Sequence, residues 1–193
     1  MLQNNTSSAV EYYPVTVVGV GSAGCTAVQN LLRMGITTDG YVCLDRDAEK
    51  LPHGDAVKAV KLDAGEDAAE CVKEQADAIS TALGSPKAVC VLAGLGGSVA
   101  SKTAPLVCDF VRDMGARLGV CVTMPFRFEG EKRMTVARES LEAMRKGAAV
   151  ESVFALDDTL HRDEAGNRLS MAQMLDAYNL SIVRVLGCMA KLM

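Results

Sequence analysis

Apolar runs of strand length alternate with stretches of helical periodicity along most of this chain. The first run, residues 15–20 (VTVVGV), is rich in β-branched side chains and stands between Pro14 and a glycine turn, which is typical of a buried strand. Most of these runs are apolar throughout, so both faces of the sheet they form should be buried. Further strands are predicted at residues 41–44, 57–62, 87–92, 118–123 and 152–156.

Segments with helical spacing separate these strands. In the first of them Val28, Leu31 and Leu32 lie on one face, and Gly35 supplies a C-terminal stop. Another helix should run from Pro105, in its first turn, to about residue 114. Helices are also predicted at residues 66–79 and 131–146.

A longer helix is predicted for the C-terminal segment. Ser170 and Gln173 match a capping box. Such a helix would be roughly 33 Å long at about 1.5 Å per residue, enough to cross a small domain. Its apolar stripe consists of Met171, Met174, Leu175, Tyr178, Ile182, Val185 and Met189.

Buried strands separated by helices predict an α/β domain with a doubly wound, mostly parallel sheet. A length of 193 residues suits one domain. We expect a tail at residues 1–14 and one domain at residues 15–193. In this class of fold ligands bind beyond the carboxyl ends of the strands, so the loops there are the candidate sites.

Composition and charge narrow the classes of partner. The 20 basic and 24 acidic residues are scattered, which argues against binding to nucleic acid or an anionic membrane. The seven cysteines form no Cys-x-x-Cys pair and lie mostly in apolar runs, as expected of a reducing compartment. The polar N-terminus does not resemble a signal peptide, and the longest uncharged run, residues 88–101, is too short to span a bilayer. We therefore expect a cytoplasmic protein, and the isolated His53 and His161 predict no metal centre.

The first predicted strand ends in a glycine-rich loop that opens a helix. Gly19, Gly21 and Gly24 let the backbone turn and approach a ligand, and the amides of the helix start suit a phosphate. The same glycines, with Asp45 about 20 residues further on, also satisfy the dinucleotide-binding fingerprint. A tight turn without a ligand is the structural alternative.

Two further loops at the same predicted edge of the sheet carry unusual sequences. Residues 93–101 (AGLGGSVAS) form a second glycine-rich loop between a strand and a helix. Two such loops fit a polyphosphate held between two helix N-termini, whereas an ordinary NAD-binding domain needs only one. Residues 125–133 (PFRFEGEKR) follow the next strand.

Together these loops resemble the GTPase domain of the tubulin/FtsZ family, nearer to bacterial FtsZ. The matching segments are Gly-Val-Gly at residues 19–21, Ala-Gly-x-Gly-Gly at residues 93–97 and Pro-Phe-x-Phe-Glu-Gly-x-x-Arg at residues 125–133, in that order and spacing. Thr-Ala-Pro at residues 103–105 and Leu-Asp-Ala-Tyr at residues 175–178 also match. The resemblance implies a Rossmann-like nucleotide-binding domain that ends in the family's long central helix.

The resemblance also implies a site for GTP or GDP, with Mg²⁺ entering only with the nucleotide. The phosphates would lie between the glycine loops, the ribose beside Glu129 and Arg133, and the guanine ring against Tyr178. Asp157 or Asp158 would stand in for an Asn of the family pattern. The implied nucleotide-binding residues are Gly19, Gly21, Ser22, Ala23, Gly24, Thr26, Gly94, Gly96, Gly97, Ser98, Val99, Glu129, Arg133, Asp158 and Tyr178.

Several positions depart from the family pattern. Val99 removes a hydroxyl expected at the phosphates, and Lys102 replaces a glycine and adds a positive charge. Two base-reading positions have become Thr26 and Ile182, and an isoleucine cannot hydrogen-bond a base. The loss of polar partners should weaken discrimination between bases.

In the family, a loop after the central helix supplies the acidic residues that activate water, and a second domain follows. This chain ends at Met193, so no catalytic residue is assigned, enzymatic activity is left open, and weak or no hydrolysis by the chain alone is expected. The expected role is a guanine-nucleotide-binding regulator or partner of a cytoskeletal filament, as in cell division. It would act through a homo-oligomer or through an FtsZ-like partner at the C-terminal helix. The alternatives are an interaction module that has lost nucleotide binding and a dinucleotide-binding Rossmann protein.

Overall fold

Parallel strands and their connecting helices make up most of the chain. The computed structural model describes residues 11–47, 49, 51, 55–62, 68–156, 162 and 166–193. A 3₁₀ turn at Arg127–Glu129 precedes α5. In chain order the elements are β1 (Tyr12–Val20), α1 (Gly21–Arg33), β2 (Thr37–Asp45), β3 (Lys58–Lys61), α2 (Ala68–Glu74), α3 (Ala76–Leu83), β4 (Ala88–Gly94), α4 (Ala100–Asp113), β5 (Arg117–Met124), α5 (Glu131–Arg145), β6 (Val150–Ala155) and α6 (Met171–Lys191).

The strands form one sheet with the order β3-β2-β1-β4-β5-β6, and each neighbouring pair is parallel. β1 lies inside the sheet, where Gly19 pairs with Cys43 of β2 on one side and with Leu92 of β4 on the other. The chain thus winds outward from β1 to β3, returns to β4 beside β1, and continues to β6. The predicted doubly wound sheet is confirmed, and the carboxyl ends of β1 and β4 form the reversal point at which ligand sites occur in such folds.

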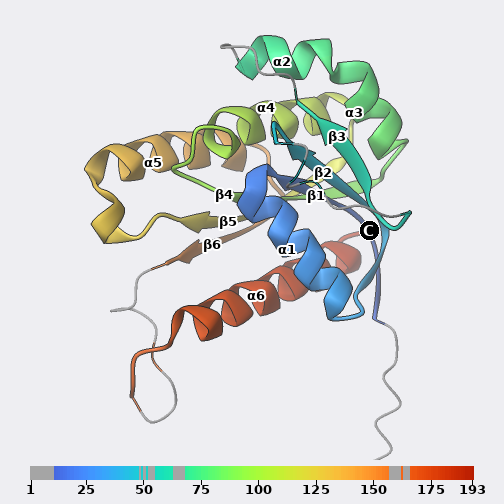
Figure 1. Cartoon of the computed structure of the whole chain (residues 1–193). Coiled ribbons are helices and arrows are strands. Elements are labelled where there is room, and N and C mark those ends of the chain that lie inside the picture. Colours follow the sequence, from blue (N-terminus) through green and yellow to red (C-terminus); the bar gives the residue numbers. More distant parts are fainter. Residues whose placement is uncertain are drawn as a thin grey trace, which may run out of the picture.

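Helices cover both faces of the sheet (Figure 1), and the sheet divides the core into two clusters. On one face α3, α4 and α5 pack against strand residues such as Val18, Val91 and Val120. On the other face α1 and α6 pack against Val17, Cys90 and Cys121. Alternate strand residues therefore serve opposite cores, which explains why the strands are apolar throughout.

The C-terminal helix α6 lies under the sheet, beside α1 (Figure 1). Its N-terminus has the predicted capping box between Ser170 and Gln173. Met171 and Leu175 of the predicted stripe are exposed. The other five members of the stripe are buried in the chain's own core: Met174, Tyr178, Ile182, Val185 and Met189.

Some predicted boundaries are wrong. The segment at residues 66–79 is interrupted at Gln75, which separates α2 from α3. Pro105 lies inside α4, not in its first turn, because the helix begins at Ala100. β1 and β2 begin earlier than predicted, at Tyr12 and Thr37, which pair with each other beyond the buried part of the sheet.

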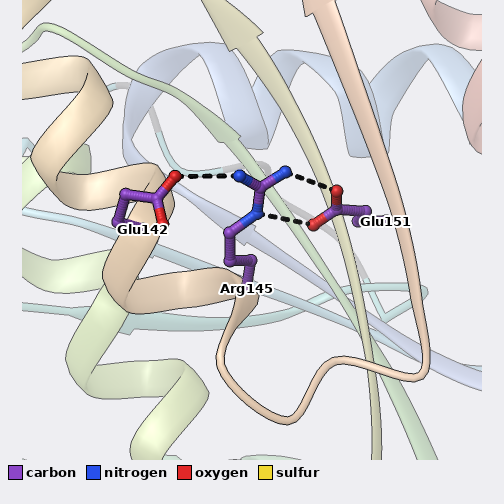
Figure 2. A network of polar contacts seen from close by, with 3 residues as sticks. All are labelled: Glu142, Arg145 and Glu151. Atoms are coloured by element: carbon purple, nitrogen blue, oxygen red, sulfur yellow. Dashed lines mark hydrogen bonds and ion pairs between the residues drawn. The ribbon is translucent and has the colours of Figure 1, made fainter.

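An ion-pair network joins the end of α5 to the edge strand β6 (Figure 2). The Arg145 guanidinium donates to both carboxylate oxygens of Glu151, at 3.1 Å and 2.6 Å. Its remaining nitrogen donates to Glu142 at 2.8 Å. All three side chains are more than a third exposed, so the network is in contact with solvent.

Most of the cysteine side chains lie in the core. Six of the seven free cysteines are buried, and Cys188 is exposed. Burial raises the pKa of the Cys108 thiol to about 12, so it stays protonated at neutral pH.

In the described ranges no helix is long and apolar enough to cross a bilayer. The same ranges contain no group of three or more His, Cys, Asp or Glu residues able to hold a metal ion.

Candidate functional site

A cavity of about 500 Å³ lies at the carboxyl edge of the sheet, between the loops that follow β1, β2, β4, β5 and β6. Its position is the one that the topology predicts, because β1 and β4 reverse the winding there. It is lined by Gly21, Ser22, Ala23, Asp45, Arg46, Asp47, Gly94, Leu95, Gly97, Ser98, Val99, Ala100, Thr123, Met124, Pro125, Glu129, Arg133 and Leu156.

The first glycine loop brings the start of α1 to the cavity wall. Gly21 has a φ of +72°, a left-handed conformation that favours glycine, and a Cβ there would lie 3.1 Å from the Cβ of Ala100. Ser22 Oγ donates to Asp45 Oδ2 at 3.0 Å, and Asp45 Oδ1 accepts from the amide of Asp47. Asp45 is only 2% exposed, so these bonds fix its carboxylate. The turn after β1 is thus tied to the end of β2.

Two glycines of the fingerprint serve packing and lie outside the cavity lining. A Cβ on Gly19 would lie 2.5 Å from the carbonyl oxygen of Gly24, and a Cβ on Gly24 would lie 2.4 Å from that of Leu92. Both contacts are with backbone, so the glycines allow α1 to pack directly on β1 and β4. Thr26 also lies outside the lining, and its hydroxyl donates to the Ser22 carbonyl at 2.8 Å.

The second glycine loop brings the start of α4 to the opposite wall. A Cβ on Gly94 would lie 2.6 Å from that of Ala23, so this glycine allows the two loops to approach each other. Gly96 has a φ of +91° and packs against Pro125, and it lies just outside the lining. Gly97 differs, because it lines the cavity and a Cβ there would meet no atom within 4 Å.

Neither of the two helices that begin at the cavity has a side-chain cap. The N-cap positions are Val20 for α1 and Val99 for α4, and neither side chain accepts a hydrogen bond from the first turn. The unpaired amides of a helix start and the positive end of its dipole attract anions. Two such starts on the walls of one cavity form an electropositive backbone surface.

The third segment adds a fixed carboxylate and a guanidinium. Glu129 Oε1 accepts from the amide of Phe126 at 2.8 Å, and Glu129 Oε2 forms an ion pair with Arg133. The Arg133 side chain is 52% exposed, so the guanidinium stays in contact with solvent. The Phe126 and Phe128 rings stack with centroids 4.9 Å apart, which stiffens the turn. The Glu129 and Arg133 side chains both line the cavity.

Tyr178 lies in the core and not in the cavity lining. Its side chain is 5% exposed, its hydroxyl donates to the Cys121 carbonyl at 3.2 Å, and its ring lies against Phe154 with centroids 5.9 Å apart. Burial raises its pKa well above the ordinary value. Ile182 is fully buried one turn further along α6. Asp157 and Asp158 lie outside the described residues.

The structure therefore brings nine of the predicted residues together and adds others. The nine are Gly21, Ser22, Ala23, Gly94, Gly97, Ser98, Val99, Glu129 and Arg133. Arg46 and Asp47, which follow directly after β2, also line the cavity and were not predicted from the sequence. Their position at the end of a strand next to β1 is a signal that could have identified them. Met124 and Leu156, at the ends of β5 and β6, add apolar surface.

Comparisons with known proteins support the resemblance that the loops predicted. No family model matches the chain. The cell division protein FtsZ of Coxiella burnetii is 27% identical over an alignment of 176 residues, and the match covers 86% of this chain and 45% of that protein. An empty FtsZ dimer from M. jannaschii superposes with a TM-score of 0.70 at 26% identity, covering 89% of this chain and 52% of that one.

A third match shows the fold alone. CetZ2 from Haloferax volcanii, in a protofilament with bound GTPγS, gives a TM-score of 0.65 at 23% identity over 92% of this chain and 58% of that one. The chain thus spans about half the length of the relatives it matches. The chain resembles the GTPase domain of the tubulin/FtsZ family in sequence and fold, as the glycine loops and the Phe-Glu-Gly segment predicted.

Proposed function

We propose that the cavity binds a guanine nucleotide, GTP or GDP, with its phosphates between the N-termini of α1 and α4. One observation carries this proposal: both helices begin at the wall of the same cavity without a side-chain cap. An anion is a favourable partner for such amides. The GTPγS bound to the CetZ2 protofilament supports a nucleotide as that anion.

The phosphates would contact backbone more than side chains. Gly21, Ser22 and Ala23 stand on one wall, and Gly97 and Ser98 on the other. The open space in front of Gly97 supports a close approach by the ligand, because the chain's own packing gives no reason for a glycine there. We propose that Mg²⁺ accompanies the nucleotide and is not held by the chain alone.

The ribose would lie beside Glu129. Its carboxylate is held by the Phe126 amide and by Arg133, so a hydroxyl donor would meet an acceptor that is already oriented. Arg133 would at the same time place a permanent positive charge near the phosphates. A nucleotide bound in this way would rely on the ribose and phosphates for most of its affinity.

We propose that hydrolysis by the chain alone is weak or absent. Water activation needs a carboxylate that is free to accept a proton. In the described lining Asp45 is bound to Ser22 and to the Asp47 amide, and Glu129 is bound to Phe126 and Arg133. The third carboxylate, that of Asp47, accepts from the Glu49 amide at 3.1 Å. These carboxylates are engaged in holding the loops.

The chain would then act in the cytoplasm as a regulator or partner of a filament, or as a homo-oligomer. The dimeric and protofilament states of the FtsZ and CetZ relatives support association as a property of the fold. On α6 a partner would contact the exposed Met171, Leu175 and Leu180, since most of the apolar stripe is already buried.

Thermal unfolding in the presence of GTP, GDP, ATP and NAD tests the proposal. A ligand at 100 times its dissociation constant stabilises a protein by about 2.7 kcal/mol, and GTP and GDP should give such a shift. Gly97→Ala should reduce the shift, because its Cβ enters the space of the ligand, while Gly40→Ala, also uncrowded but on β2 outside the lining, should not. A shift with NAD alone would instead support the hypothesis of a dinucleotide-binding protein, in which the Asp45 carboxylate binds the ribose. No shift with any of the four would favour an interaction module.

A further inference from the structure

The second glycine loop is held by hydrogen bonds that lead back to α5. The Gly96 amide donates to Ser101 Oγ at 2.7 Å, across the loop. The Ser101 carbonyl oxygen lies 2.7 Å from Ser140 Oγ, which donates to it from α5. Both serines are buried, and neither lines the cavity. Ser101, a single residue of α4, therefore connects the glycine loop to α5.

The Ser101 carbonyl requires this outside donor because of Pro105. In an α-helix the carbonyl of each residue accepts from the amide four residues later, and the residue four after Ser101 is a proline inside α4, which has no N–H. A buried carbonyl without a donor is strongly unfavourable. The Ser140 hydroxyl supplies the donor that Pro105 lacks.

A second acceptor competes for the same proton. Ser140 Oγ also lies 2.8 Å from the Val136 carbonyl, one turn earlier in α5. A serine hydroxyl has one proton and donates to one acceptor at a time. The Val136 carbonyl has its regular helical partner, the Ser140 amide, whereas the Ser101 carbonyl has none. The hydroxyl therefore stabilises the structure more when it donates to Ser101.

We propose that Ser140 is a positioning residue for the cavity. By holding Ser101 it fixes the turn at Gly96 and so keeps Gly97 and Ser98 at the cavity wall. Gly96, with its left-handed φ and its contact with Pro125, leaves the loop little room to adjust. The inference rests on the proposed function, since it concerns the loop assigned to the phosphates.

Amide hydrogen exchange in the ligand-free protein tests the hydrogen-bond chain directly. Ser140→Ala should speed exchange of the Gly96 amide by about tenfold, because the loop opens more often once Ser101 is released. Amides in the middle of β4 should be unaffected. Ser140→Thr keeps the hydroxyl and should restore slow exchange. Thr135→Ala removes a hydroxyl from the exposed face of the same helix and is the matched control.

A second substitution separates this role from general packing. Pro105→Ala returns the missing amide, which can then donate to the Ser101 carbonyl within α4. In that background Ser140→Ala should change the exchange of the Gly96 amide by less than about twofold. Equal effects of Ser140→Ala in both backgrounds, or no effect in either, would overturn the inference.

Titration calorimetry with GDP and with Mg²⁺·GTP measures the consequence for binding. Ser140→Ala should weaken affinity by about five- to tenfold, and the Pro105→Ala background should remove most of that loss. Faster exchange with unchanged affinity would overturn the positioning role. If the unaltered chain binds neither nucleotide, the proposed function fails, while the exchange measurements still decide whether Ser140 holds the loop.

Discussion

The start of α6, which lies away from the cavity, differs from the starts of α1 and α4 at the cavity wall. At the start of α6, Ser170 Oγ accepts from the Gln173 amide at 3.3 Å, and the Gln173 side chain accepts from the Ser170 amide at 2.9 Å. At α1 and α4 the corresponding positions are Val20 and Val99, which provide no cap. The chain thus caps the solvent-facing start of α6 and leaves the starts of α1 and α4 uncapped, as it also does those of α3 and α5. The α3 start lies outside the cavity lining, whereas the starts of α1 and α4 form part of it.

The uncapped starts of α1 and α4 indicate a ligand because both lie on the wall of one cavity. A capping side chain stabilises a helix by about 1 kcal/mol, so two uncapped starts forgo a stabilisation that the sequence uses at α6. An anion that binds both starts would provide the missing hydrogen bonds. Three substitutions test this difference between the helix starts. They change the placement of the α1 start, the charge at the α4 start and the cap of α6.

The largest effect is expected from Gly24→Ala, which disturbs the placement of the α1 start. A Cβ there would lie 2.4 Å from the Leu92 carbonyl, and backbone cannot move aside as a side chain can. We expect a loss of about 3 kcal/mol in the free energy of unfolding. Denaturant unfolding measures it. Gly97→Ala, with no atom within 4 Å, should leave stability unchanged, and equal losses at both glycines would contradict this assignment.

A negative charge at the α4 start should raise the stability of the ligand-free protein and weaken its affinity for nucleotide. Ser98 is exposed at the cavity wall, next to the N-cap Val99. Ser98→Asp should stabilise the ligand-free protein by about 0.3–1 kcal/mol through the helix dipole. It should also weaken nucleotide affinity by about 100-fold, because like charges brought together are strongly unfavourable.

Thermal unfolding and titration calorimetry on Ser98→Asp measure these two effects, and the neutral, nearly isosteric Ser98→Asn is the control. Opposite signs for stability and affinity would support an anion at the α4 start. A variant that binds GDP as tightly as the unaltered chain would place the phosphates elsewhere.

Sequence predicted the architecture well because strand runs and helical periodicity are local signals. It could not assign the roles of individual glycines, since Gly24 and Gly97 look alike in the sequence and differ only in what stands opposite them in the fold. The role of Tyr178 could not be assigned from the sequence either. Whether a residue on an apolar stripe faces the core or a ligand depends on how α6 packs against the sheet. Pro105 was misplaced because the donor that makes it acceptable inside α4 comes from Ser140, 39 residues after Ser101.

Removing the cap of α6 is expected to have a smaller and purely structural effect. Ser170→Ala takes away the acceptor for the Gln173 amide, and we expect a loss of about 1 kcal/mol in the free energy of unfolding. Nucleotide affinity should not change, because Ser170 is not part of the cavity lining. Unfolding and binding measured on the same preparation check this, and Ser170→Asp, which keeps a cap, should restore stability. A loss of affinity with Ser170→Ala would connect the α6 start to the site.

The smallest effect is expected at the far end of α5, where a second ion pair offers a comparison with Glu129 and Arg133. A hydrogen bond from Arg145 lowers the pKa of Glu151 below its ordinary value of 4.5. A carboxylate with a lowered pKa in the folded state stabilises the protein above the unfolded pKa, and that stabilisation is lost as the pH falls through the folded value. Because both side chains are solvent-exposed, the contribution is small and screened by salt.

Glu151→Gln should therefore flatten the dependence of stability on pH below about pH 4.5, and at pH 7 it should lower stability slightly, less so at high salt. Affinity for nucleotide should stay unchanged, whereas Glu129→Gln should weaken it, because only Glu129 lines the cavity. Denaturant unfolding at low and high salt measures how stability depends on pH. A range of roughly pH 3 to pH 7 is sufficient, because carboxyl groups titrate within it. An affinity loss with Glu151→Gln equal to that with Glu129→Gln would mean that α5 transmits strain from its far end to the site, and that Glu129 acts through the helix and not through contact with the ligand.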